Sequence, residues 1–260
     1  MSMHTVRRGT GKPLLLLHGI GGSWESWTPI LDELAEQREV IAVDLPGFGD
    51  TPPLPAPLTF AALTDATVQY LHDNALTGVD VVGSSMGARL VLELARRGEV
   101  GAVVALDPGG FWQGWERALF GTSIALSIRL IRTLQPAMPA ITTSAVGRTL
   151  MFAQLSPRPW DLSPSVLLTE MRNFAKSPSF DDLLADLVKS PMQEGIGRGV
   201  LQKPMVIGWG RSDRVTLPRQ AARAIARFPD ARMYWFERAG HFPMWDVPAE
   251  TVRLILETTA

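Results

Sequence analysis

The chain has 260 residues, of which 46% are hydrophobic and 20% charged, and its 25 basic and 26 acidic side chains leave a formal net charge of −1. It contains no cysteine, which excludes disulfides, thiolate nucleophiles, Fe–S clusters and cysteine-based zinc sites. The balanced charge argues against a nucleic-acid partner, which needs a basic face, and four histidines leave few candidates for a general base or a metal site.

Over the first 110 residues, short apolar runs alternate with stretches in which apolar residues recur at helical spacing. The runs predict buried strands, and the periodic stretches predict helices. In chain order these are a strand at 12–19, a helix at 26–37 with Ser26 as its N-cap, a strand at 39–44, a helix at 60–74, a strand at 78–83, a helix at 86–97 and a strand at 101–107. This alternation is typical of an α/β protein with a mostly parallel sheet.

The alternation stops between residues 111 and 200, where prolines separate four helix-like segments, at 115–134, 140–155, 165–176 and 180–189. It resumes with a strand at 204–210, a helix at 218–228, a strand at 231–237 and a helix at 248–257. The sequence therefore predicts one α/β domain, residues 1–110 and 201–260, interrupted by a helical insertion at 111–200.

A nucleophile motif follows the third predicted strand of the domain. Residues 83–87 read Gly-Ser-Ser-Met-Gly and run straight into a helix, which is the G-x-S-x-G pattern in its strand–turn–helix context. Such a tight turn strains the central residue and exposes its side chain at the N-terminus of the helix. We therefore expect Ser85 to be the nucleophile and the Met86 N–H to stabilise an oxyanion. The alternative is an ordinary turn of small residues.

A serine nucleophile needs a base and an orienting carboxylate. His241 is the only histidine after Ser85, and it follows a predicted strand, where α/β sheets place their active sites. Asp213, which follows the strand at 204–210, is the expected carboxylate, and Asp107, which ends the strand at 101–107, is the alternative. The loop after the first strand should supply a second oxyanion donor, the N–H of Ile20 or, failing that, of Gly21, and His18 is expected to hold this loop.

Five segments, in order, carry a resemblance to a known family: LLLLHGIGGSWESW, VDLPGFGDT, VVGSSMGARL, WGRSDRVTLP and AGHFPMWDVP. Together they resemble the α/β-hydrolase fold superfamily. The resemblance implies a doubly wound, mostly parallel sheet, a Ser-His-Asp triad and a helical lid at 111–200. The short N-terminal arm has room for one strand and at most an abbreviated second, so the first strand of the family is expected to be missing.

The resemblance further implies a serine hydrolase, with no metal or organic cofactor, that cleaves a carboxylic ester or lactone of a small-to-medium hydrophobic substrate. Relatives that open epoxides or remove halide carry aspartate at the position of Ser85, which argues against those reactions. Hydrolysis of a carbon–carbon bond and perhydrolase or haloperoxidase-like chemistry remain alternatives on the same triad. A non-catalytic ligand-binding receptor is an alternative of another class.

Tryptophans and glycines supply the candidates for the substrate pocket, although each tryptophan by itself is more typical of a helix packed on the core. These candidates are Gly21, Trp24, Trp112, Trp115 and Trp160. No apolar stretch is long enough to span a bilayer and no leader precedes the first strand, so we expect a cytoplasmic protein acting on a small molecule. The chain is compatible with a monomer or a homodimer.

Overall fold

Within the residues that the computed structural model describes, 2–55 and 57–260, seven strands form one sheet in the order β1-β3-β2-β4-β5-β6-β7. Only β1 is antiparallel to its neighbour, and every other pair is parallel. The strands are β1 (Thr5–Arg8), β2 (Pro13–Leu17), β3 (Glu39–Val43), β4 (Asp80–Ser84), β5 (Val103–Leu106), β6 (Met205–Gly210) and β7 (Arg232–Phe236). A single strand, β1, therefore occupies the N-terminal arm.

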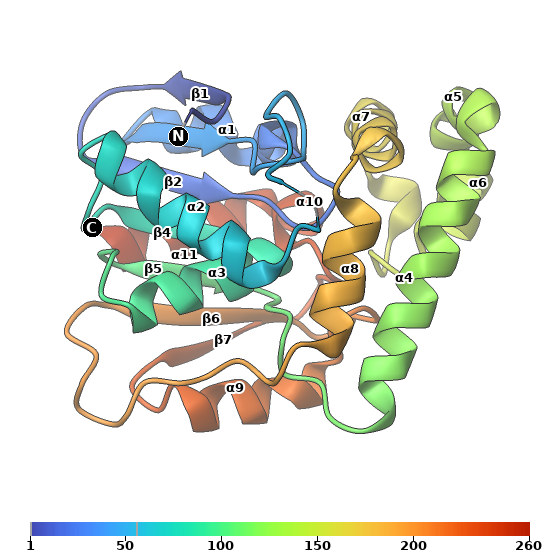
Figure 1. The fold of residues 1–260 in the computed structure, drawn as a ribbon. Coiled ribbons are helices and arrows are strands. Elements are labelled where there is room, and N and C mark those ends of the chain that lie inside the picture. Colours follow the sequence, from blue (N-terminus) through green and yellow to red (C-terminus); the bar gives the residue numbers. More distant parts are fainter. Residues whose placement is uncertain (1, 56) are drawn as a thin grey trace.

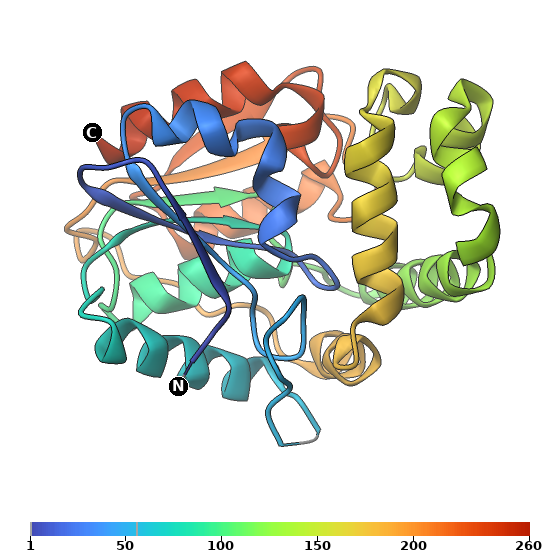
Figure 2. The same cartoon turned by 90° about the horizontal axis from the view of Figure 1, so that it is seen from above.

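Both faces of the sheet are covered by helices, which explains why its strands read as continuous apolar runs. Successive residues of β2 point to opposite sides, because Leu15 and Leu17 join one buried cluster while Leu14 and Leu16 join the other. Helices α1 (Thr28–Ala35) and α11 (Pro248–Thr259) cover one face; α2 (Phe60–Asp73), α3 (Met86–Arg96) and α9 (Ala221–Arg227) cover the opposite face (Figure 2). The predicted doubly wound α/β fold is confirmed.

The segment between β5 and β6 forms a helical layer beyond one end of the sheet, on the right in Figure 1. Its helices are α4 (Trp115–Thr133), α5 (Met138–Thr143), α6 (Ala145–Phe152), α7 (Pro164–Lys176) and α8 (Phe180–Lys189). The strands point toward this layer, so it lies over their carboxyl ends, where α/β sheets bind ligands.

Two predicted helix boundaries are wrong, for local reasons. The single helix expected at 140–155 is two helices, because Ser144 takes an extended backbone and its hydroxyl accepts the N–H of Gly147 as the cap of α6. Ser26 is not an N-cap. The side chain of Ser23 caps a short 3-10 helix, η1 (Trp24–Trp27), and α1 starts after it.

Shorter helical turns complete the chain. These are η2 (Gln135–Ala137), η3 (Pro159–Asp161), η4 (Pro218–Gln220) and α10 (Pro243–Asp246). In the part of the chain described here, no helix combines the length and the hydropathy that crossing a bilayer requires.

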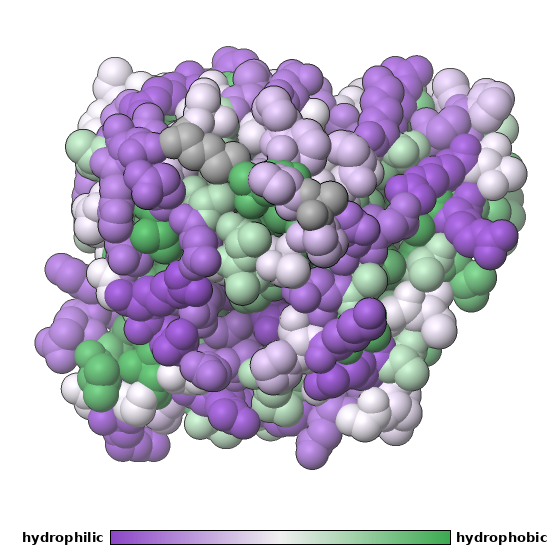
Figure 3. All heavy atoms as spheres, in the orientation of Figure 1, coloured by the Kyte–Doolittle hydropathy of each residue, from purple (hydrophilic) through white to green (hydrophobic). Residues whose placement is uncertain are grey.

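Hydrophilic side chains spread over both the core and the insertion on the face seen in Figure 3, with small hydrophobic patches between them. Large exposed apolar side chains nevertheless concentrate in the insertion. All eight among the described residues belong to it: Trp115, Leu119, Leu126, Leu130, Val146, Leu150, Trp160 and, at its end, Val200.

Candidate active site

Ser85 stands at a strained turn between β4 and α3. Its φ of 57° and ψ of −113° lie outside the regions that ordinary residues prefer. The two flanking glycines are required by close backbone approaches. A Cβ at Gly83 would lie 2.2 Å from the carbonyl oxygen of Gly87, and a Cβ at Gly87 would lie 2.1 Å from that of Leu17. The motif therefore fixes a turn that no larger residue could make at these two positions.

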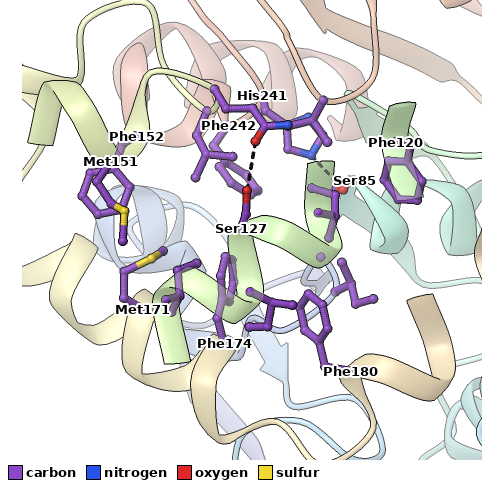
Figure 4. A pocket seen from close by; sticks show the side chains of 18 residues that line it. Ser85, Phe120, Ser127, Met151, Phe152, Met171, Phe174, Phe180, His241 and Phe242 are labelled. Atoms are coloured by element: carbon purple, nitrogen blue, oxygen red, sulfur yellow. Dashed lines mark hydrogen bonds between the residues drawn. The ribbon is translucent and has the colours of Figure 1, made fainter. Parts of the chain in front are cut away.

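His241 lies in the loop after β7 and faces Ser85. Its Nε2 is 2.8 Å from Ser85 Oγ (Figure 4), and the ring is almost fully buried. Two successive backbone N–H groups fix this loop, since that of His241 donates to the carbonyl of Leu155 and that of Gly240 donates to the carboxylate of Asp246. Leu155 follows α6, so the insertion itself helps to position the imidazole.

Asp213 completes a chain of hydrogen bonds. Its Oδ2 is 2.9 Å from His241 Nδ1, and its carboxylate also accepts the backbone N–H groups of Val215 and Thr216 and the Thr216 hydroxyl. Because a carboxylate only accepts, Nδ1 carries the imidazole proton and Nε2 is free to accept the Ser85 hydroxyl. The structure thus brings together the three residues expected from sequence. Asp107, the alternative, lies beside Asp213 and makes its hydrogen bond to the N–H of Gly210 instead.

The two expected oxyanion donors flank the serine. Ile20 lines the space in front of Ser85, and Met86 is the first residue of α3. Among the described residues, neither backbone N–H donates to another protein group. The loop of Ile20 presses on the serine, because a Cβ at Gly19 would lie 3.2 Å from Ser85 Cβ. His18 holds this loop as expected, since its Nε2 accepts the N–H of Leu45.

A mostly apolar cavity opens beside Ser85 and His241 (Figure 4). The cavity has a volume of about 70 Å³, counted as the space open to the centre of a water-sized sphere. Counted in the same way, a cavity that holds one water has a volume of about 10–15 Å³. It therefore has room for a small acyl or alcohol group. The insertion supplies most of its lining: Phe120, Ile124, Ser127, Ile128, Ile131, Met151, Phe152, Gln154, Leu155, Met171, Phe174 and Phe180; the core adds Gly19, Ile20, Val215 and Phe242.

The prediction that tryptophans line this cavity is wrong. Neither Trp24 nor Trp112 lines the cavity. The backbone N–H of Trp24 donates to Asp44, and the ring of Trp112 stacks on Phe120 with ring centroids 4.4 Å apart. Trp115 and Trp160 are 60% and 47% exposed.

Gly21 does not reach the cavity either. It leaves room for two lining rings, because a Cβ there would lie 2.7 Å from Phe180 and 2.9 Å from Phe174.

A periodic signal in α4 could have identified part of the lining. Phe120, Ile124, Ile128 and Ile131 recur every three or four residues and so share one helix face. The outward-facing apolar residues of the same helix follow a similar spacing. For that reason the sequence pattern alone does not tell which face covers the serine.

Glu170 of α7 is an unexpected buried acid where the insertion meets η1. Its side chain is 1% exposed, and neither carboxyl oxygen has a hydrogen-bond partner among the described residues. Burial raises the pKa of Glu170 to about 8; the nearby Ser26 hydroxyl offsets part of this effect and the charge of Glu25 adds to it. The carboxyl group is therefore protonated in the folded protein at neutral pH.

We expect Glu170 to make the fold less stable as the pH rises. The pKa of Glu170 is higher in the folded than in the unfolded chain, so the stabilisation that Glu170 provides is complete below about pH 4.5. This stabilisation is lost as the pH rises through 8, and the free energy of unfolding falls by about 5 kcal/mol at most. The free energy of unfolding, measured in urea at pH 5, 7 and 8.5, should depend less on pH in Glu170→Gln than in the wild type. Glu33→Gln, at an exposed position, is the matched control. Parallel curves for the wild type and Glu170→Gln would contradict a buried, protonated Glu170.

Comparison with known proteins places this architecture among hydrolases. Residues 14–254 match a family described as the alpha/beta hydrolase family. Among curated proteins, Lipase 3 of Moraxella sp. is 25% identical over 93% of this chain and 75% of its own length. A 2-hydroxy-6-oxo-6-phenylhexa-2,4-dienoate hydrolase of Burkholderia cepacia is 24% identical over 99% of this chain and 91% of its own.

Among solved structures, a thermophilic esterase from Thermogutta terrifontis superposes with a TM-score of 0.75 at 20% identity. The match covers 98% of this chain and 92% of the esterase. At this identity the likeness concerns the fold.

Proposed function

Because the chain belongs to the alpha/beta hydrolase family and is a hydrolase, we propose that it cleaves carboxylic esters or lactones of small-to-medium hydrophobic substrates through a Ser85 acyl-enzyme. The observation that carries the proposal is the hydrogen-bonded chain from Asp213 through His241 to Ser85, which ends in an apolar cavity. The similarity of the chain to a lipase and to an esterase supports ester chemistry.

In this mechanism His241 Nε2 takes the proton of Ser85 as Oγ attacks the substrate carbonyl. The free N–H groups of Ile20 and Met86 hold the oxyanion that develops. Asp213 keeps the proton on Nδ1 and stabilises the imidazolium. His241 then protonates the leaving alkoxide, and a water deprotonated by the same ring releases the acid and restores Ser85.

The helical insertion acts as a lid in this proposal. It provides most of the cavity wall, and the Leu155 carbonyl accepts the N–H of His241. A wall of phenylalanine, isoleucine and methionine favours an apolar acyl or alcohol group. Residues 111–200 would then serve both substrate selection and the placement of the base.

An activity panel tests the proposed function. p-Nitrophenyl esters of increasing acyl length, aliphatic lactones, a vinylogous diketone and peracid formation should be assayed together. We expect turnover of short and medium esters or of lactones, with a decline for long acyl chains. Turnover of the diketone alone would assign carbon–carbon hydrolysis. The similarity to the Burkholderia dienoate hydrolase is the reason for including this substrate. Saturable binding without turnover of any compound would assign a receptor.

Two polar side chains interrupt the apolar wall and predict a substrate preference. Ser127 donates to the amide oxygen of Gln154 (Figure 4), and the Gln154 amide nitrogen donates to Ser123, which leaves one amide hydrogen without an acceptor among the described residues. One hydrogen bond to a substrate oxygen contributes about 0.5–1.5 kcal/mol. We therefore expect Gln154→Met to lower kcat/KM for oxo- or hydroxy-substituted esters by about three- to tenfold.

Plain alkyl esters are the control for Gln154→Met, because they make no such bond. Their kcat/KM should stay within about twofold of the wild-type value. An equal loss on both substrate classes would mean that Gln154 supports the insertion and does not contact the substrate.

A further inference from the structure

A second carboxyl group lies beside the Asp213–His241 pair. Asp107 follows β5, whose neighbour in the sheet is β6, so the loops that carry Asp107 and Asp213 are adjacent. Asp107 is completely buried. One oxygen of each carboxyl group and a ring nitrogen of His241 all lie within 4.8 Å of one another. The proposed mechanism gives Asp107 no task, although it lies in one cluster with the carboxylate and the base of the triad.

The hydrogen-bond donors around this cluster are divided unequally. Asp213 accepts from two backbone N–H groups, the Thr216 hydroxyl and the imidazole. Asp107 Oδ1 accepts one N–H, from Gly210, and its Oδ2 has no donor among the described residues. Thr216 also lies 3.2 Å from the backbone carbonyl of Asp107. A buried oxygen without a donor is costly, unless it carries a proton of its own.

Electrostatics assigns that proton to Asp107. Burial raises the pKa of Asp107 well above its usual range, and the neighbouring charge of Asp213, with a smaller effect from Asp246, raises it further. His241 is a titratable group that also faces Asp107, but its Nδ1–H donates to Asp213. Two carboxyl groups this close retain one proton between them, and it stays on the group with fewer donors. Asp107 is therefore the neutral member of the pair.

We propose that Asp107 is a neutral carboxylic acid whose Oδ2–H donates to the Asp213 carboxylate and so limits how strongly Asp213 attracts the His241 imidazolium. Asp107 is then a positioning residue, which acts on the base through Asp213. Its backbone supports a fixed role, because it holds a φ of 49°, a conformation that a non-glycine residue adopts at a cost. The effect on catalysis rests on the proposed function, whereas the protonation state of Asp107 does not.

A pair of variants separates the donor from the bulk of the side chain. Asp107→Asn keeps the shape and an N–H donor, while Asp107→Leu keeps a similar volume and removes the donor. Without the donor, Asp213 carries more negative charge toward the imidazole and stabilises the imidazolium more strongly. We expect the acid limb of the kcat/KM profile to move upward by about 0.5 pH unit or more in Asp107→Leu. Asp107→Asn should leave it within about 0.2 unit of the wild type.

A merely structural role would lower the rate of Asp107→Leu without moving the limb. An unmoved limb in that variant, or an equal shift in both variants, would overturn the proposal. Circular dichroism and thermal unfolding establish that each variant is folded before its profile is compared with the wild type.

A measurement without substrate tests the proton directly. The protein labelled with ¹³C at the aspartate carboxyl carbons should show one resonance at the position of a neutral acid above pH 6, and Asp107→Asn should lack it. Absence of such a resonance from the wild type would overturn the proposal even if the enzyme hydrolyses esters. If the resonance is present but no ester is turned over, the proposed function fails and the protonated Asp107 stands. This measurement also decides the matter if Asp107→Leu does not fold.

Discussion

Ser85→Ala is expected to reduce hydrolysis of an activated ester by roughly six orders of magnitude, or to the detection limit. Among the described residues, the Ser85 hydroxyl is the only proton donor that His241 Nε2 contacts. The methyl group of alanine can neither attack a carbonyl nor form an acyl-enzyme. Labelling by a fluorophosphonate should vanish in parallel, since it requires the same oxygen.

The neighbouring serine provides a matched control for this experiment. Ser84 is buried in β4, and its hydroxyl has no hydrogen-bond partner among the described residues. Ser84→Ala should therefore fold as well as the wild type and keep its activity within a few-fold. Undiminished turnover by Ser85→Ala, or a loss in Ser84→Ala that equals it, would refute Ser85 as the nucleophile.

Asp213→Asn is expected to lower kcat by about four orders of magnitude while substrate binding changes little. The amide can place an N–H toward His241 Nδ1, which then becomes the acceptor and leaves the proton on Nε2, where it cannot receive the Ser85 hydroxyl. The amide also removes the charge that stabilises the imidazolium. Single-turnover kinetics with a p-nitrophenyl ester, together with KM, should separate these effects.

Asp107→Asn is the matched control for Asp213→Asn. Both variants change one buried aspartate of the same cluster, but only Asp213 lies 2.9 Å from Nδ1. Asp107→Asn should cost less than about tenfold in kcat. A reversed order of the two losses would make Asp107 the triad acid, the alternative that the sequence left open.

Local patterns explain how much of the fold could be read from the sequence. The strands are apolar because both faces of the sheet are covered, and the turn at Ser85 needs glycine where a Cβ would collide with backbone. Such constraints leave a local signature in the sequence, either a continuous apolar run or a glycine at a fixed spacing from the serine, even where the contacting residue is distant in the chain. The sequence did not predict the break at Ser144, because a serine inside an apolar periodic stretch can either continue a helix or cap the next one.

The contents of the site depended on contacts between distant segments. The residue pattern was enough to predict the succession of strands and helices, the position of the serine turn and the short list of candidates for base and acid. The folded structure was needed to show that His241 pairs with Asp213 rather than Asp107 and that phenylalanines, not tryptophans, line the cavity. Periodicity indicates that a helix has an apolar face, but the packing of the insertion on the sheet selects which face covers Ser85. Differences of a few ångströms between distant segments select which carboxylate reaches the imidazole.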